Sequence, residues 1–288
     1  MKYEAIQTCS REHSVRKMCS VLGLRAANYY RWKRRRKQRE KREEKERELA
    51  ARIRQEFLEN KRLYGYRKMR KSLEKQGVVL SEYKIRDIMR KTGLYPVSMK
   101  KYRPGRSLSV RIPYSPNELK QAFRAEAPGQ VLAGDITYIK TNKGWVYLAI
   151  VMDLYHREVV GYAVSQSIDS ELVKRALSNA IARNGGLRGA LFHSDRGTQY
   201  SSESYRRMLE ENGIRQSMSR SGCPYDNACS ESFFATAKKE CIYLKNYATI
   251  EEVKRDIYEY VEIFYNRKRM HSYLGYMSPV EYRLAHNA

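Results

Sequence analysis

Three carboxylates in the C-terminal half of the chain have types and positions that could do chemistry. Asp135 lies within an apolar, strand-like segment, where a carboxylate facing a core is costly unless it is paired or metal-bound. Asp195 follows a second short strand, and sheet proteins build sites outside strand ends. Glu231 lies at the start of a helical segment. Each has a simpler explanation alone, because an Asp after a strand often closes a turn and a helical Glu usually faces solvent.

Taken together, the three carboxylates predict a metal-dependent centre. They supply only hard oxygen ligands, with no Cys or His cluster nearby, and this chemistry selects Mg²⁺ or Mn²⁺ over zinc. Two such ions about 3.5–4 Å apart can activate an attacking hydroxyl and stabilise the leaving oxygen of a phosphodiester. The residues therefore predict two metal ions and in-line phosphodiester transfer.

The elements that must position these carboxylates form an alternating pattern after Gln130. Strands are predicted over 131–140, 144–154, 158–165, 189–193 and 214–218, and helices over 170–183, about 202–212 and 250–267. A helix carrying Glu231 precedes the last of these. The pattern predicts an α/β fold with a mixed sheet layered by helices.

The N-terminal half is predicted to be helical throughout. Short amphipathic helices around a Gly23 turn predict a helix-turn-helix, and a second unit of this kind has a Gly77 break and Ser81 as an N-cap. The predicted organisation is as follows: a helix-turn-helix-like segment at 1–37, a connecting helix at 38–62, a second helix-turn-helix-like segment at 63–99, a basic, proline-containing linker at 100–128, and the catalytic core at 129–288.

Charge is concentrated in the first part of the chain. Residues 1–126 carry a net charge of +22 and residues 127–288 a net charge of +3. Such an excess favours a polyanion, and DNA or RNA phosphate is the obvious candidate. The run Arg34, Arg35 and Arg36 is a candidate for phosphate contact, although a solvated helix face explains such a run equally well.

Membrane association and export are not predicted. The longest apolar run, Trp145 to Met152, has eight residues, far fewer than the roughly 20 of a membrane-spanning helix. The first residues are too polar for a signal peptide, and the five cysteines include no Cys-x-x-Cys pair. We therefore expect reduced thiols, a cytoplasmic location at the bacterial nucleoid, and no membrane partner.

The chain also resembles bacterial insertion-sequence transposases whose second reading frame encodes an integrase-like catalytic core. The resemblance rests first on the 35 residues between Asp195 and Glu231, which match the Asp, Asp-35-Glu signature. The local segments that match are Asp135 to Ile139, His193 to Ser202, Tyr225 to Phe234, Tyr265 to His271, Leu274 to Pro279 and, upstream, Leu63 to Arg67. Leu132 and the stretch Ser221 to Tyr225 depart from the usual pattern.

The resemblance implies a ribonuclease-H-like core that cleaves the ends of an insertion element and catalyses strand transfer. It implies that Asp135, Asp195 and Glu231 are both catalytic residues and the ligands of two Mg²⁺ or Mn²⁺ ions. Lys238 matches a lysine that contacts DNA in the family. The predicted DNA contacts are Lys238, Arg220, Asn227, Arg196, Arg34, Arg35 and Arg36. Expected partners are the terminal inverted repeats, target DNA, further copies of the chain on DNA, and an upstream-reading-frame protein as fusion or partner.

Two other classes of function remain open from the sequence. A hydrolytic nuclease with the same carboxylates would cut DNA without joining it. A DNA-binding regulator on the same scaffold would have no catalytic activity.

Overall fold

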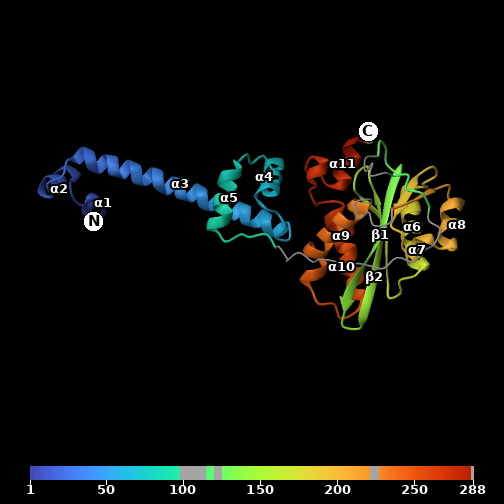
Figure 1. Cartoon of the computed structure of the whole chain (residues 1–288). Helices are drawn as coiled ribbons and strands as arrows, with labels where there is room; N and C mark the ends of the chain where they lie inside the picture. The colour runs from blue at the N-terminus through green and yellow to red at the C-terminus, as the bar shows by residue number, and fades with distance from the viewer. Residues whose placement is uncertain (98–114, 120–124, 221–226, 287–288) are drawn as a thin grey trace. The chain divides into compact units, whose positions relative to one another are not determined.

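The computed structural model describes residues 1–97, 115–119, 125–220 and 227–286, and it divides the chain into two compact units, Met1–Pro96 and Val97–Ala288 (Figure 1). The stretch Ser221 to Tyr225, where the sequence departs from the family pattern, lies outside the described residues, as does most of the predicted linker. Among the helices of the described segments, none combines the length and apolar character of a membrane span. The two units are described separately below.

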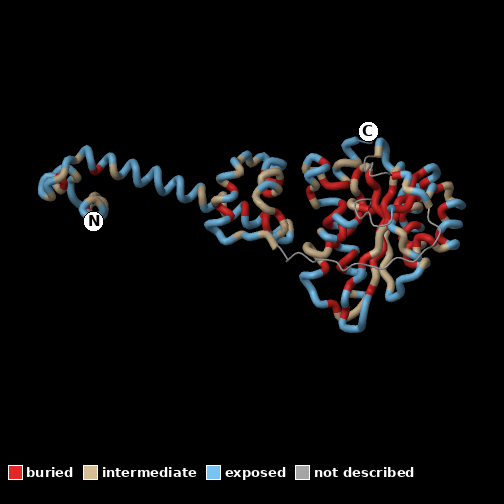
Figure 2. Tube along the Cα trace, viewed as in Figure 1, coloured by how far each residue is buried: buried red, intermediate tan, exposed pale blue. Residues whose placement is uncertain are grey.

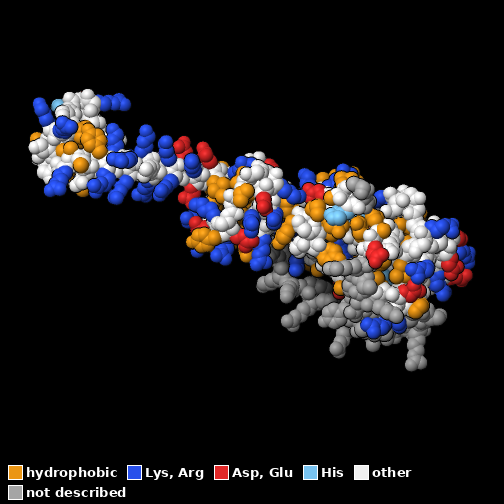
Figure 3. Space-filling model, turned by 90° about the horizontal axis from the view of Figure 1, so that it is seen from above, with side chains coloured by type: hydrophobic (Ala, Val, Ile, Leu, Met, Phe, Trp, Pro, Cys, Tyr) orange, Lys and Arg blue, Asp and Glu red, His pale blue; other side chains and the backbone are white. Residues whose placement is uncertain are grey.

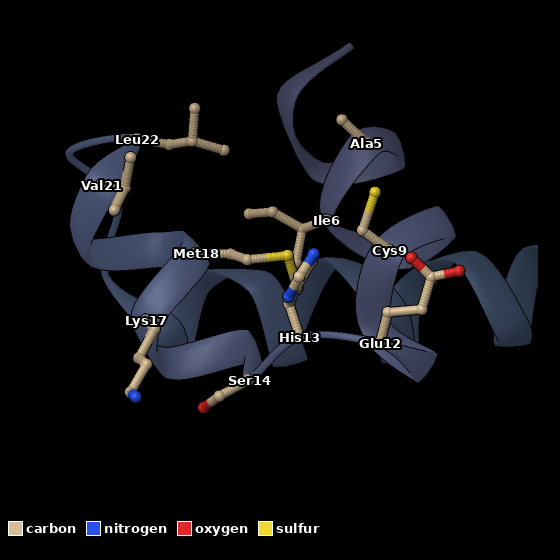
Figure 4. Close-up of a pocket in the computed structure, with 10 residues that line it drawn as sticks. All are labelled: Ala5, Ile6, Cys9, Glu12, His13, Ser14, Lys17, Met18, Val21 and Leu22. Carbon is tan, nitrogen blue, oxygen red and sulfur yellow. The ribbon is translucent and has the colours of Figure 1, made fainter.

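The first unit begins with a small helical cluster. It contains α1 (Lys2–Thr8), η1 (Cys9–Arg11), α2 (Val15–Val21) and the long α3 (Ala26–Glu59). Ile6, Cys19 and Tyr29 form its buried centre. Side chains of α1, η1 and α2 also line a hollow of about 520 Å³, in which Ile6 and Leu22 point toward each other (Figure 4).

The N-terminal helices differ from the sequence prediction in two respects. Helix α1 was not one of the two helices predicted around Gly23, because its short, polar sequence has little helical periodicity. The boundary expected between residues 37 and 38 lies inside α3, which is one continuous helix. No Gly or Pro interrupts the strong helix formers from Ala26 to Glu59, so nothing ends the helix at that boundary.

The second helical pair packs against the C-terminal part of α3. It consists of α4 (Tyr66–Lys75) and α5 (Glu82–Lys91). Ser81 caps α5 as predicted, because its hydroxyl accepts a hydrogen bond from the Lys84 amide at 3.2 Å. The buried carboxylate of Glu56 on α3 accepts hydrogen bonds from Ser72 and Gln76, which joins α3 to α4 and the turn after it.

The second unit is built on a five-stranded mixed sheet of order β3-β2-β1-β4-β5. The strands are β1 (Val131–Thr141), β2 (Gly144–Asp153), β3 (Val159–Ser165), β4 (Leu191–Ser194) and β5 (Arg215–Met218). The pairs β1–β2 and β2–β3 are antiparallel, and β1–β4 and β4–β5 are parallel. The predicted α/β fold with a mixed sheet is confirmed.

Helices cover both faces of this sheet (Figure 1). One side carries α6 (Ser170–Asn184), α7 (Thr198–Ser201) and α8 (Glu203–Glu211), and the other carries α9 (Ala228–Glu240) and α10 (Ile250–Tyr258). The predicted helix over 250–267 is α10 followed by a π-helical segment, η4 (Glu259–Tyr265). The sheet and the inner faces of these helices form the buried core (Figure 2).

The C-terminal segment contains η3 (Ile242–Leu244), η5 (Ser272–Leu274) and α11 (Pro279–His286), which the sequence analysis did not predict. The start of α11 is a capping box. The Ser278 hydroxyl accepts from the Glu281 amide at 3.3 Å, and the Glu281 carboxylate accepts from the Ser278 amide at 2.8 Å. Pro279 occupies the first helical position, where its missing N–H costs nothing.

Part of the segment that the sequence assigns to a linker packs on the core. The Met218 amide donates to the Pro116 carbonyl, and the Ser217 hydroxyl accepts from the Glu118 amide at 2.9 Å. Leu119 is buried. The open edge of β5 leaves backbone groups that need partners, and this extended segment supplies them.

Close packing of α6 on β3 depends on Gly161. A Cβ at this position would lie 2.2 Å from the Ala176 carbonyl oxygen and 2.7 Å from the Ala180 nitrogen. We therefore expect Gly161→Ala to lower the free energy of unfolding by about 1 to 3 kcal/mol, because helix backbone must move to admit the methyl group. Chemical denaturation of the full chain measures the change.

Gly65→Ala is the comparison, since its Cβ would approach nothing closer than Pro96 at 3.8 Å, and it should cost less than about 1 kcal/mol through the lost N-cap of α4. Equal stability of Gly161→Ala and the wild type would contradict the close packing of α6 on β3.

Candidate active site

The register of the central parallel pair aligns the two aspartates. Pairing of β1 with β4 joins Val131 to Leu191 and Ala133 to His193. The last pair is Ala133 with His193, and the same register continued by two residues sets Asp135 beside Asp195, just past the end of β4. Neighbouring strands lie about 4.8 Å apart. Asp195 is the first residue after β4, and its Oδ1 accepts a hydrogen bond from the Gly197 amide at 3.0 Å.

Helix α9 brings the third carboxylate to the same strand. It packs against β1 and begins at Ala228, three residues before Glu231. Lys238 follows Glu231 by seven residues, which is close to two helical turns, so both side chains lie on one face of α9. The Lys238 Nζ lies 5.0 Å from the centre of the Tyr138 ring on β1.

The charges of these side chains act on one another. Burial, followed by the negative charge of Asp195, raises the pKa of the Asp135 carboxyl well above its usual range. Glu231 raises the same pKa further, while the Ile136 amide and the Lys238 ammonium lower it. Loss of solvent also raises the pKa of Asp195 and of Glu231. The three carboxylates and Lys238 therefore form one electrostatic cluster, which we call the carboxylate cluster.

The carboxylate cluster has the donor set of a hard divalent cation. Asp135 is buried beside the negative charges of Asp195 and Glu231, and a bound cation would offset both the burial and the repulsion that raise its pKa. Within the described segments, no three Asp, Glu, His or Cys side chains already stand at metal-binding distance from one another. Closure of the cluster around a cation therefore requires side-chain movement.

The predicted DNA contacts have different environments. Arg196 adjoins Asp195, but its Nε donates to the Ser219 carbonyl at 2.8 Å. Asn227 is buried at the start of α9 and does not cap it through its side chain. Arg220 is exposed and follows β5.

The three predicted arginines of the N-terminal unit lie on α3. Arg34 and Arg35 are exposed. Arg36 instead donates to Glu40 at 2.9 Å and to Gln7 at 3.2 Å, and its guanidinium lies over the Trp32 ring. It therefore joins α1 to α3 within the cluster of short helices.

The residues that hold α9 in place were missed by sequence reasoning. At its C-terminal end, Arg269 forms two hydrogen bonds with Glu240, at 2.8 and 2.9 Å, and the Tyr260 hydroxyl donates to the same carboxylate at 2.9 Å. At its N-terminal end, Arg157 donates to the Cys229 sulfur and lies over the Tyr273 ring at 4.4 Å. No local pattern signalled these contacts, because Arg269 lies 29 residues from Glu240 and Arg157 lies 72 residues from Cys229 in the sequence.

Two other polar residues near the cluster are structural. Asp153 ends β2 and accepts hydrogen bonds from the Gly129 and Tyr155 amides at 2.6 and 2.8 Å, with burial raising its pKa to about 6. His193 is fully buried and its ring nitrogens contact the hydroxyls of Ser217 and Ser219 at 2.9 and 3.1 Å. Neither is placed to act as a general base.

Comparison with known proteins identifies related sequences over nearly the whole chain. Two family profiles described as "Integrase core domain" match residues 125–224 and 231–286, and one described as "HTH-like domain" matches residues 43–102. "Transposase InsF for insertion sequence IS3A" from Escherichia coli (strain K12) is 36% identical over 282 residues, covering 98% of each chain. "Insertion element IS600 uncharacterized 31 kDa protein" from Shigella sonnei is 35% identical over 266 residues, covering 92% of this chain and 97% of that one.

Solved structures with a similar fold include integrase and transposase cores. The HTLV-2 integrase catalytic core domain in complex with magnesium has a TM-score of 0.40 at 14% identity, covering 55% of this chain and 98% of that chain. The catalytic domain of Mos1 mariner transposase has a TM-score of 0.41 at 15% identity, covering 47% of this chain and 71% of that one.

Repulsion within the carboxylate cluster predicts that Asp135→Asn stabilises the protein when no divalent cation is present. A raised folded-state pKa means that stability is present at low pH and is lost as pH rises through that pKa. At neutral pH the free energy of unfolding of Asp135→Asn should therefore exceed that of the wild type by about 1 to 2 kcal/mol, the scale for relieving one buried polar group. This difference between the variant and the wild type should shrink as pH falls.

Thermal unfolding in a chelator, measured across pH, tests this expectation. Glu203→Gln, an exposed change on α8, is the control and should leave the unfolding temperature unchanged. Equal stability of the wild type and Asp135→Asn at neutral pH would contradict the expectation that ionised Asp135 is destabilised by burial and by its neighbouring carboxylates.

The Arg269–Glu240 pair predicts a large cost for its disruption. Both side chains are mostly buried, at 13% and 14% exposed, so Arg269→Ala leaves a buried carboxylate with one partner fewer. We expect a loss of about 3 kcal/mol in unfolding free energy. Arg269→Lys should recover only part, because lysine cannot form the paired hydrogen bonds.

Denaturant titration measures the free energy of unfolding of the wild type and of each variant. Arg207→Ala, which removes an exposed pair with Glu203 on α8, should cost less than about 1 kcal/mol. Similar losses of unfolding free energy for Arg269→Ala and Arg207→Ala would contradict the stabilising role of the buried Arg269–Glu240 pair.

Proposed function

Because the chain belongs to the family of the InsF transposases of IS3-type insertion sequences, we propose that it cleaves the DNA ends of an insertion element and joins them to target DNA. The observation that carries this proposal is the alignment of Asp135 with Asp195 beside a helix that presents Glu231 and Lys238. Sheet register and the packing of α9 on β1 support this proposal, because they bring the segments that carry these four residues together.

The proposed roles follow from charge and position. Asp135, Asp195 and Glu231 would hold two divalent cations, Mg²⁺ or Mn²⁺. Bound there, such cations activate the attacking hydroxyl and stabilise the leaving oxygen of the scissile phosphodiester. Lys238 binds a DNA phosphate beside the cluster, and Arg220 binds another. The raised pKa values mean that the carboxylates must lose protons before a cation binds, so activity should fall as pH is lowered.

DNA binding by the N-terminal unit is a separate part of the proposal. The family match over α4 and α5 supports a helix-turn-helix role, and Lys and Arg side chains line the long helix α3 (Figure 3). Arg34 and Arg35 are exposed there and can bind phosphates, which would fix the position of the protein on the duplex without reading its sequence.

We extend the proposal to the assembly and its location. The chain acts in the bacterial cytoplasm at the nucleoid, as several copies on the terminal repeats, with an upstream-reading-frame protein as fusion or partner. Its DNA substrates are the terminal inverted repeats and the target.

Incubation of labelled element-end DNA with the full chain and Mg²⁺ tests the chemistry. We expect both nicked and joined products, and a loss of at least about 1,000-fold in rate for Asp135→Asn, Asp195→Asn and Glu231→Gln, because each removes a cation ligand. Products that are cut but never joined would indicate a hydrolytic nuclease. Unchanged transposition in cells by the three variants would indicate a regulator without catalytic activity.

Lys238→Ala should weaken DNA binding more than it affects folding. Loss of one phosphate contact should reduce the dependence of log affinity on log salt concentration by about one unit. Fluorescence anisotropy at several salt concentrations measures the slope. Lys174→Ala, on α6 across the sheet from α9, should leave the slope unchanged, and equal slopes for all three proteins would contradict the proposed contact.

A further inference from the structure

A broad groove adjoins the carboxylate cluster and has no role in the function proposed above. It has a volume of about 1,100 Å³ and lies between the end of the β1–β2 hairpin and the segment around η3. Aromatic side chains dominate its walls, among them Tyr138, Trp145, Tyr147 and Tyr243. None of the described side chains that line it is acidic, and Lys140 contributes positive charge, whereas the Lys245 ammonium is paired with Asp256 at 2.6 Å.

Two of the aromatic rings that line the groove are largely exposed. Trp145 is 50% exposed and Tyr138 is 44% exposed. Their rings meet edge to face, with centres 5.2 Å apart and planes at 89°. In this arrangement two apolar surfaces at right angles remain open to solvent, which is costly unless a ligand covers them.

The groove is held rigidly before any ligand binds. The Asn142 amide donates to the Tyr247 carbonyl at 2.9 Å, and Thr141 pairs with Tyr247 as an isolated β-bridge. Ile242 and Tyr247 are buried beneath it. These contacts join the hairpin to the η3 segment, so the two walls keep a fixed separation.

The groove is continuous with the carboxylate cluster through Tyr138 and Lys238. Tyr138 follows Asp135 by three residues along β1, about 10 Å in an extended strand, and this odd spacing directs the two side chains to opposite faces of the strand, so the connection runs through Lys238. The Lys238 ammonium lies over the Tyr138 ring and also lowers the Asp135 pKa. A DNA strand whose reacting phosphate lies at the carboxylates would therefore bring bases only a few nucleotides away into the groove.

We propose that this groove binds unpaired nucleobases of DNA next to the reacting phosphate, with Trp145 and Tyr138 as stacking surfaces. Exposed aromatic rings in a basic, acid-free groove are the chemistry that holds single-stranded nucleic acid, because every base offers a face for stacking. Lys140 contributes charge for the adjoining phosphates. The proposal rests on the proposed function for the identity of the strand, and it adds that strand ends are unpaired when bound.

The two tryptophans of the chain allow a direct test. In a Trp32→Phe background Trp145 is the only tryptophan, so its fluorescence reports on the groove alone. We expect quenching by single-stranded oligodeoxythymidylate and by a duplex with an unpaired 3′ end, and little quenching by the same duplex with blunt ends. Trp145→Ala and Tyr138→Ala, followed by anisotropy in the full chain, should each weaken single-strand binding about ten-fold.

Tyr258→Ala is the matched control, because this tyrosine is 55% exposed on α10 and does not line the groove. It should bind single strands like the wild type. The proposal is overturned if single strands leave Trp145 fluorescence unchanged, if blunt duplex quenches it equally, or if quenching depends on protein concentration alone, which would indicate a second copy in the groove.

The catalytic proposal and the groove proposal fail separately in this design. Glu231→Gln should lose strand transfer and keep the quenching by single strands. Quenching without any transfer activity in the wild type would contradict only the catalytic proposal, and transfer without quenching would contradict only the groove.

Discussion

Burial of Asp135 beside the negative charges of Asp195 and Glu231 is the arrangement that the rest of the second unit must support. Parallel register carries the two aspartates to the same level of neighbouring strands, and α9 adds the third charge. Burial, and then the negative charges of Asp195 and Glu231, raises the pKa of Asp135, so the ionised cluster is destabilising when no cation is bound. A protein keeps such a cluster where function requires it, and the surrounding fold must be stable enough to hold the charges together.

The stabilising contacts are concentrated where the C-terminal segment meets the sheet and α9. Arg269 fastens the end of α9 through Glu240, and the Asn266 side chain pairs with both backbone groups of Val159 at 3.0 Å. Glu158, almost fully buried, binds Arg183 at 3.1 Å and Arg283 at 2.9 Å, which links α6 and α11 to the start of β3. The segment after α9 therefore resists displacement of Glu231, and Arg269 and Arg283 contribute to this through their ion pairs.

Sequence reasoning succeeded where local pattern and long-range geometry agree. The strands, the mixed sheet and the cap at Ser81 were predictable because alternation, apolar runs and N-cap chemistry are local signals. Side-by-side placement of Asp135 and Asp195 was predictable only from resemblance, because register depends on pairing between strands 60 residues apart. The continuity of α3, the attachment of residues 115–119 to β5 and the Arg269–Glu240 pair were missed. The last two depend on partners distant in sequence, which no local pattern encodes.

Binding of Mn²⁺ to the full chain, followed by electron paramagnetic resonance of the free ion, would show whether the carboxylate cluster is a cation site. We expect the wild type to remove Mn²⁺ from solution as pH rises through the raised carboxylate pKa values, and Asp135→Asn and Asp195→Asn to bind it far more weakly. Equal Mn²⁺ binding by the wild type and both variants would contradict the claim that these carboxylates form one cation site.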